Sequence, residues 1–164
     1  MPTIDRDARA FSHALSELIR VVQFRDRDRA CCHDLSVSQC YALERVVDGG
    51  GLTVNELAAH LYLDKSTASR VANTLVAKGL VARARDSVDG RIVRLEPTRD
   101  GLAVHQLVKT DLANEYVALL ADFDPDVRSA FTELLGRLGG AFAARVDVTN
   151  GRCCAIPGSI GATL

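Results

Sequence analysis

Two short amphipathic segments close together in the chain constrain its fold more than any other feature. Thr53 and Glu56 have the spacing of a capping box, which begins a short helix from Val54 to His60. After a tight turn, Asp64 can cap a second helix, and Gly79 is a suitable stop for it. The apolar positions of that second helix recur at helical spacing: Ala68, Val71, Ala72, Leu75 and Val76. The sequence therefore predicts two short helices joined by a tight turn.

The hydrophobic period changes directly after these helices, from 3.6 toward 2. Val81, Arg83 and Arg85 alternate with apolar or small residues, and Arg91 to Leu95 forms a second run of this kind. The pair Asp89-Gly90 lies between the two runs and is typical of a hairpin turn. Residues 80–96 therefore predict a β-hairpin with basic residues along it.

Four further helices are predicted outside this region. The polar segment 25–34 breaks the helical period of the first of them, so we expect a fraying helix end and a loop there. Pro125 is well suited to the first turn of the last helix. The four helices span about 6–25, Val37 to Val47 after a cap at Ser36, the opening Pro97-Thr98 to about Ala121, and Pro125 to the stop at Asn150-Gly151.

Together these elements predict a fold that is mainly α with a small β-hairpin wing (α+β), a winged helix-turn-helix. The outer helices carry more apolar surface than one small domain can cover, so we expect the N- and C-terminal helices to form a dimerisation region. The whole chain, 1–164, is predicted to be one domain. Its parts are the winged helix-turn-helix at 35–96, dimerisation helices at 6–30 and 98–147, and a tail at 148–164.

The charge distribution favours a nucleic-acid partner. The net charge is only -1, but residues 61–95 hold seven Lys/Arg and three Asp, a local +4 that leaves -5 for the remainder. A basic segment on an acidic body is typical of phosphate binding. No apolar run approaches the roughly 18 residues of a membrane span, and the N-terminus lacks a signal-peptide pattern. We therefore expect a cytoplasmic protein with no membrane partner.

The second short helix carries small and polar side chains on its outer face, which suits insertion into the major groove of double-stranded DNA. The serine and threonine hydroxyls can donate and accept there, Arg70 can pair with guanine, and the first-turn N–H groups can hold a phosphate. Arg91 of the hairpin could enter the adjacent minor groove. The predicted DNA-binding residues are Lys65, Ser66, Thr67, Ser69, Arg70, Asn73 and Arg91.

These motifs resemble those of the MarR family, the multiple-antibiotic-resistance regulators. The resemblance is carried by residues 52–58, 63–70, 75–81, 86–91 and 95–101. It implies a homodimer on pseudo-palindromic operators, usually a repressor that releases DNA when a small molecule, an oxidant or a metal acts on it. It also implies that Lys65 to Leu75 is the recognition helix, and that Asp86 or Asp89 pairs with Arg91 to hold the wing.

Five cysteines suggest a sensor, since their number is odd and four of them form adjacent pairs. Soft thiolates suit a thiophilic metal or metalloid such as arsenite, antimonite, cadmium or zinc. We predict an inducer site built from Cys31, Cys32, Cys153 and Cys154, with no cofactor required for DNA binding. A redox switch, an aromatic-ligand inducer and no sensory role are the alternatives. Cys40 is expected to be a small buried hydrophobe.

Enzymatic function is not predicted. The sequence has no G-x-S-x-G, no glycine-rich phosphate loop and no H-E-x-x-H. A thiol-dependent enzyme that uses Cys31 or Cys32 is the remote alternative.

Overall fold

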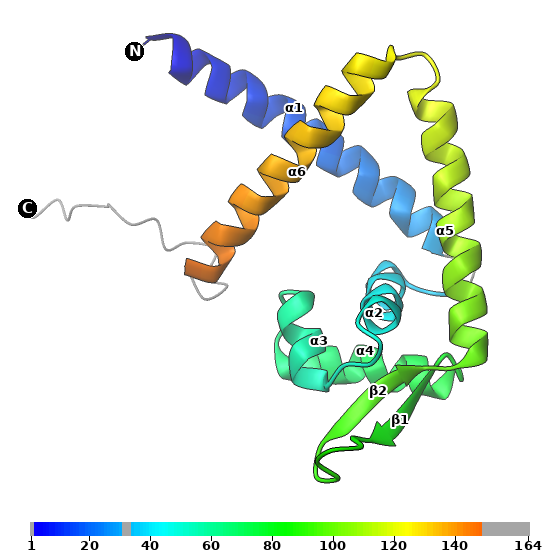
Figure 1. Cartoon of the computed structure of the whole chain (residues 1–164). Helices are drawn as coiled ribbons and strands as arrows, with labels where there is room; N and C mark the ends of the chain where they lie inside the picture. The colour runs from blue at the N-terminus through cyan, green and yellow to red at the C-terminus, as the bar shows by residue number, and fades with distance from the viewer. Residues whose placement is uncertain (1, 31–33, 149–164) are drawn as a thin grey trace, which may run out of the picture. The chain divides into compact units, whose positions relative to one another are not determined.

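A computed structural model describes residues 2–30 and 34–148 (Figure 1). The chain divides into two compact units, residues 1–111 and 112–164. The elements in chain order are α1 (Pro2–Ala30), α2 (Val37–Asp48), α3 (Val54–His60), α4 (Lys65–Ala77), β1 (Val81–Arg85), β2 (Val93–Pro97), α5 (Arg99–Leu120) and α6 (Pro125–Val148). The mainly helical fold with a two-stranded hairpin, as predicted, is confirmed.

The starts of α2 and α3 follow from local capping, as the sequence predicts. Ser36 and Gln39 form a reciprocal capping box at α2, and Thr53 and Glu56 form another at α3. The Thr53 hydroxyl accepts from the Glu56 N–H at 3.2 Å, while the Glu56 carboxylate accepts from the Thr53 N–H at 2.7 Å. Each box satisfies two backbone donors that the first turn of a helix leaves unpaired.

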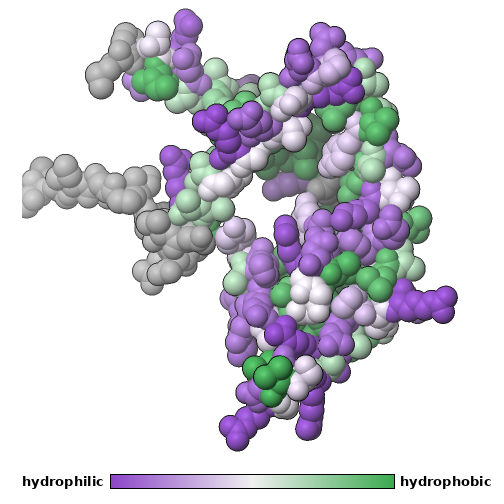
Figure 2. Space-filling model, in the orientation of Figure 1, coloured by the Kyte–Doolittle hydropathy of each residue, from purple (hydrophilic) through white to green (hydrophobic). Residues whose placement is uncertain are grey.

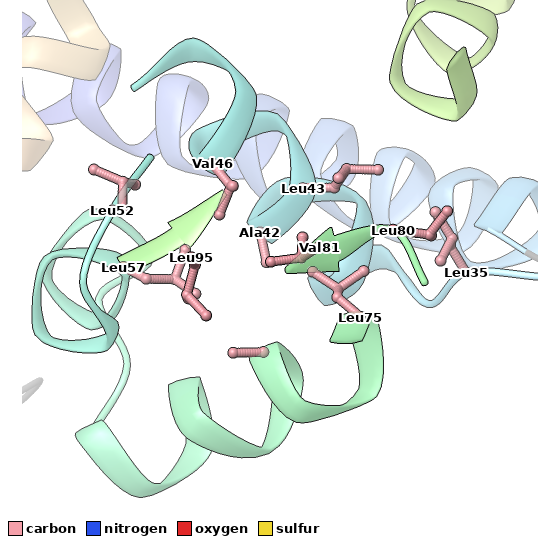
Figure 3. Close-up of a cluster of buried hydrophobic side chains, with 11 residues drawn as sticks. Leu35, Ala42, Leu43, Val46, Leu52, Leu57, Leu75, Leu80, Val81 and Leu95 are labelled. Carbon is pink, nitrogen blue, oxygen red and sulfur yellow. The ribbon is translucent and has the colours of Figure 1, made fainter. Parts of the chain in front are cut away.

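One apolar core holds α2, α3, α4 and the hairpin together (Figure 3). The inward residues of α4 predicted from the period are buried or half-buried, and Ala68, Ala72 and Leu75 are completely covered. Helix α4 is therefore fixed to the core along one side, and its other side remains at the surface. The core comprises Leu35, Ala42, Leu43, Val46, Leu52, Leu57, Ala72, Leu75, Leu80, Val81 and Leu95.

Strand β2 has hydrogen-bonded neighbours on both sides. It pairs with β1 in antiparallel register, with Arg83 opposite Leu95. On its other side Leu95 exchanges two backbone hydrogen bonds with Leu52, at 2.7 and 3.0 Å. The hairpin is thus attached to the segment before α3 as well as to the core.

The start of α5 is packed unusually closely on the turn before β1. The Thr98 N–H donates to the Leu80 carbonyl at 3.1 Å, and the Thr98 hydroxyl donates to the Gly79 carbonyl at 2.7 Å. A Cβ atom at Gly101 would lie 2.9 Å from the carbonyl carbon of Leu80 and closer still to its oxygen. Glycine is therefore required at position 101 by close approach rather than by its backbone angles.

Three boundaries differ from the sequence prediction. Helix α1 continues through the charged residues to Ala30 instead of fraying after 25, because arginine is a good helix former and extending an existing helix is easier than nucleating one. Strand β2 begins at Val93 rather than Arg91, and Pro97 ends this strand instead of opening α5. The predicted stop at Asn150-Gly151 lies outside the described residues.

The second unit contains the end of α5 and the whole of α6, which begins at Pro125 as predicted. Large apolar side chains recur along one side of α6, and each of them is about half exposed. They are Val127, Phe131, Leu134, Leu135 and Phe142.

Candidate nucleic-acid interface

Helix α4 presents its predicted polar residues on the side opposite the core. Lys65, Ser66, Arg70 and Asn73 are exposed, and Thr67 and Ser69 are half-buried at its edge. The spacing of three and four residues repeats along the helix, so these side chains share one face. The structure thus brings six of the seven predicted DNA-binding residues together on one helix.

Asp64 organises the first turn of α4. Its carboxylate accepts from the Ser66 hydroxyl at 2.5 Å, the Thr67 hydroxyl at 2.7 Å and the Thr67 N–H at 2.9 Å. The hydrogen bonds from the Ser66 and Thr67 hydroxyls are the main reason that the pKa of Asp64 is well below its usual range. Asp64 therefore stays ionised, and it acts as the N-cap that the sequence predicts.

The same network defines what the first turn can offer a ligand. Because both hydroxyl protons point to Asp64, the Ser66 and Thr67 hydroxyls are available to a ligand as acceptors, although the sequence alone allowed them either to donate or to accept. The Thr67 hydroxyl in turn accepts from a guanidinium N–H of Arg70 at 3.0 Å. Arg70 is thus held over the start of the helix, with further N–H groups available for a planar acceptor pair.

The hairpin adds basic side chains beside α4. Arg83 of β1 donates to the Asn73 amide oxygen at 2.6 Å. At the far end of the hairpin, Arg91 is exposed within the loop that joins the strands. Figure 2 shows hydrophilic side chains projecting around the end of the hairpin, beside a small hydrophobic patch. The exposed large hydrophobic residues of this part of the hairpin include Val88, Ile92 and Val93, and Val88 is 95% exposed.

The wing is held by a residue other than the one implied by the family resemblance. Asp86 pairs with Arg94, at 2.5 Å, rather than with Arg91. The Nη1 group of the Arg94 guanidinium donates to the Gly51 carbonyl at 3.1 Å. Asp89 does contact Arg91, but through the Arg91 backbone N–H at 3.0 Å. Arg94 was missed because its partners lie 8 and 43 positions away in the chain.

Asp86 also shapes the loop of the hairpin. Its other carboxylate oxygen accepts from the Val88 and Asp89 N–H groups, at 2.8 and 3.0 Å. The guanidinium of Arg94 and these two N–H groups lower the pKa of Asp86 to about 2. The loop therefore begins at Asp86, three residues before Asp89-Gly90. Because this loop is longer than a two-residue hairpin turn, β2 starts later than such a turn predicts.

The proposed cysteine site falls on residues that the structure does not describe. Cys31, Cys32, Cys153 and Cys154 all lie outside the described ranges. Within residues 2–30 and 34–148 no group of three or more His, Cys, Asp or Glu side chains could hold a metal ion. Cys40 is half-buried and packs against the core, in keeping with its prediction as a small hydrophobe. None of the described helices is long and apolar enough to cross a membrane.

Two adjoining helices, one buried on its inner side and polar on its outer side, with a hairpin attached, define the winged helix-turn-helix class of protein. A family model described as the MarR family matches residues 33–92. The chain is 32% identical over 133 residues to YxaD of Bacillus subtilis, an uncharacterised HTH-type transcriptional regulator, covering 79% of this chain and 91% of YxaD. The chain belongs to the MarR family and is a transcriptional regulator, not an enzyme.

Solved structures have the same fold. A MarR family protein from Bacillus stearothermophilus matches with a TM-score of 0.77 at 24% identity, over 84% of this chain and 96% of that protein. Streptococcus pneumoniae FabT, solved in complex with DNA, matches with a TM-score of 0.73 at 17% identity, over 82% of this chain and 96% of FabT.

Proposed function

We propose that this regulator binds double-stranded DNA with α4 in the major groove and the hairpin in the adjacent minor groove. The observation that carries the proposal is the Asp64, Thr67 and Arg70 network, which fixes an arginine on the outer face of a helix whose inner face is buried. A guanidinium held in this way is suited to the paired O6 and N7 acceptors of guanine. FabT, which has the same fold, was solved in complex with DNA, and this supports DNA as the partner.

The other predicted contacts divide into reading and positioning roles. Ser66 and Thr67 accept from base amino groups, since their protons are engaged by Asp64. Lys65 and Ser69 contact the phosphate backbone, and Arg91 enters the minor groove from the exposed hairpin loop. Because the Asp64 carboxylate already accepts the Thr67 N–H, the first turn of α4 contributes less to phosphate binding than an uncapped helix would.

Fluorescence anisotropy tests the DNA proposal. The protein is titrated onto its own upstream DNA and onto random DNA at one fixed salt concentration. We expect tighter binding to the upstream DNA, with a preference that Arg70→Ala weakens. Equal affinity for both DNAs would contradict it.

We further propose that the regulator is a homodimer and binds a pseudo-palindromic operator as a repressor. The apolar side of α6 supports this, since an exposed stripe of two phenylalanines and two leucines is unfavourable in water. Leu134→Asp should dissociate the dimer in sedimentation experiments, whereas Ser129→Asp, on the opposite side of α6, should not. A monomeric wild type would refute the proposal.

The inducer proposed from the sequence is a thiophilic metal or metalloid bound by the two cysteine pairs, Cys31-Cys32 and Cys153-Cys154. The proposal is supported by the two pairs of adjacent cysteines, because the side chains of neighbouring residues diverge and rarely both point into one core. Arsenite, antimonite, cadmium or zinc should release the protein from DNA, and Cys153→Ser with Cys154→Ser should abolish that release without weakening DNA binding. Release by a mild oxidant alone would favour a redox switch instead.

A partly open pocket supports a second candidate inducer, a small aromatic or apolar molecule. It lies between α1 and α2. Its volume of about 580 Å³ is within the usual size range of ligand pockets. Its lining is largely apolar with one amide and one phenol: Leu18, Ile19, Val22, Gln23, Val37 and Tyr41. Salicylate in the same anisotropy titration tests it. Release by salicylate that Val22→Phe prevents would support this site, and unchanged release would exclude it.

A further inference from the structure

A hydrogen bond joins the recognition helix to the wing at the surface that faces DNA in our proposal. Arg83 of β1 donates to the Asn73 amide oxygen of α4 at 2.6 Å, and both side chains are exposed. Asn73 is one of the predicted DNA-binding residues, whereas Arg83 was expected only to add to the basic character of the hairpin. The bond therefore limits which hydrogen-bonding group Asn73 can present to a base.

The backbone of both elements places Arg83 where it can reach Asn73. Arg83 follows Val81 by two residues and lies opposite Leu95 in the hairpin register, so these three side chains share one face of the hairpin. Val81 and Leu95 are buried against the core that includes Leu75 of α4. Arg83 continues this face beyond the edge of the core, at the outer side of α4.

The chemistry of the pair fixes which end of the Asn73 side-chain amide faces Arg83. A free asparagine can present either its oxygen, which accepts, or its NH2 group, which donates, by rotation of the terminal torsion. Arginine has only donors, so Arg83 can hold only the oxygen end. While the bond lasts, the NH2 group is the end of Asn73 turned away from the wing.

We propose that Arg83 is a specificity-determining positioning residue that makes Asn73 a hydrogen-bond donor toward the bases. The inference rests on the proposed entry of α4 into the major groove. Purines offer N7 there and thymine offers O4, but cytosine offers only its amino donor. The contacted strand should therefore accept adenine, guanine or thymine opposite Asn73 and exclude cytosine.

Selection from a randomised operator library, read by sequencing, tests this with the full-length protein. Asn73→Ala identifies the contacted position as the one where base preference disappears. Wild type should deplete cytosine there by about fivefold or more, the size of one base contact. Arg83→Ala should reduce that depletion to less than about twofold, while Arg83→Lys, which also only donates, should keep it.

Arg85→Ala is the matched control, because it removes the same charge two residues along the same strand. It should leave the cytosine depletion unchanged. In the Asn73→Ala background, Arg83→Ala should cause no further change in base preference, since its effect acts through Asn73. Equal depletion in wild type and Arg83→Ala, or a further change in the double variant, would overturn the inference.

Salt dependence separates positioning from phosphate contact. If Arg83 binds a phosphate, Arg83→Ala weakens binding to every sequence and lowers the slope of log K against log salt by about 1. If Arg83 is a positioning residue, Arg83→Ala leaves this slope unchanged and alters the base preference. A lowered slope with unaltered base preference would overturn the inference. A wild type with no base preference anywhere would instead refute the proposed use of α4 itself.

Discussion

Replacing Gly101 with alanine should destabilise the protein through one steric contact. The new Cβ atom would lie 2.9 Å from the carbonyl carbon of Leu80, where ordinary contacts are 3.4–4 Å. The neighbouring Leu80 atoms belong to the backbone, which cannot rotate away as a side chain can. The start of α5 must therefore move away from the turn that precedes β1.

The size of the effect follows from what this movement disrupts. Overpacking costs about 1–3 kcal/mol. Thr98 would also lose or lengthen its hydrogen bonds to Gly79 and Leu80, each of which contributes about 1 kcal/mol. Alanine regains about 1 kcal/mol of helix propensity over glycine. We expect a net loss of about 2–4 kcal/mol in the free energy of unfolding, a large share of the roughly 5–15 kcal/mol of a typical domain.

Urea unfolding followed by circular dichroism measures this change. Gly136→Ala is the matched control, because it lies within a helix, on the side of α6 away from the apolar stripe, and its added Cβ meets nothing within 4 Å. It should be neutral or gain up to about 1 kcal/mol. If Gly101→Ala were as stable as the control, the close approach of α5 to Leu80 would be refuted.

Three further outcomes are expected. Thr53→Ala should lower the unfolding free energy by about 1 kcal/mol in urea titrations, since it removes a cap, whereas Thr53→Ser should retain most of it. Asp86 has a folded pKa near 2, below its usual value of about 3.9, so its contribution is complete above about pH 5 and is lost as the pH falls toward 2. The melting temperature of Asp86→Asn should thus be below that of wild type at pH 7 and approach it near pH 3; a constant difference would contradict the ion pair. Arg70→Ala should cost about 1–3 kcal/mol on specific DNA and relax preference at one base pair, and an equal loss on random DNA would make Arg70 a phosphate contact.

Much of the local structure could be predicted from the sequence because its causes lie within one or two helical turns. The cap at Ser36 and the capping box at Thr53 connect residues three apart. The buried stripe of α4 follows from the helical period, and the six candidate DNA-binding residues of that helix follow from the complementary face. The extent of α1 was underestimated, because a charged segment without an apolar period can still extend a helix that is already formed.

By itself, the sequence determined which segments are helices and strands and which face of α4 is polar. Only the tertiary structure decided that Arg94, and not Arg91, holds Asp86, because the choice depends on the Gly51 carbonyl that pairing of Leu52 with β2 brings alongside. It likewise decided that Arg83 holds Asn73, since that bond requires α4 and β1 to share one core. Side chains far apart in sequence become partners only through packing, which no local pattern encodes.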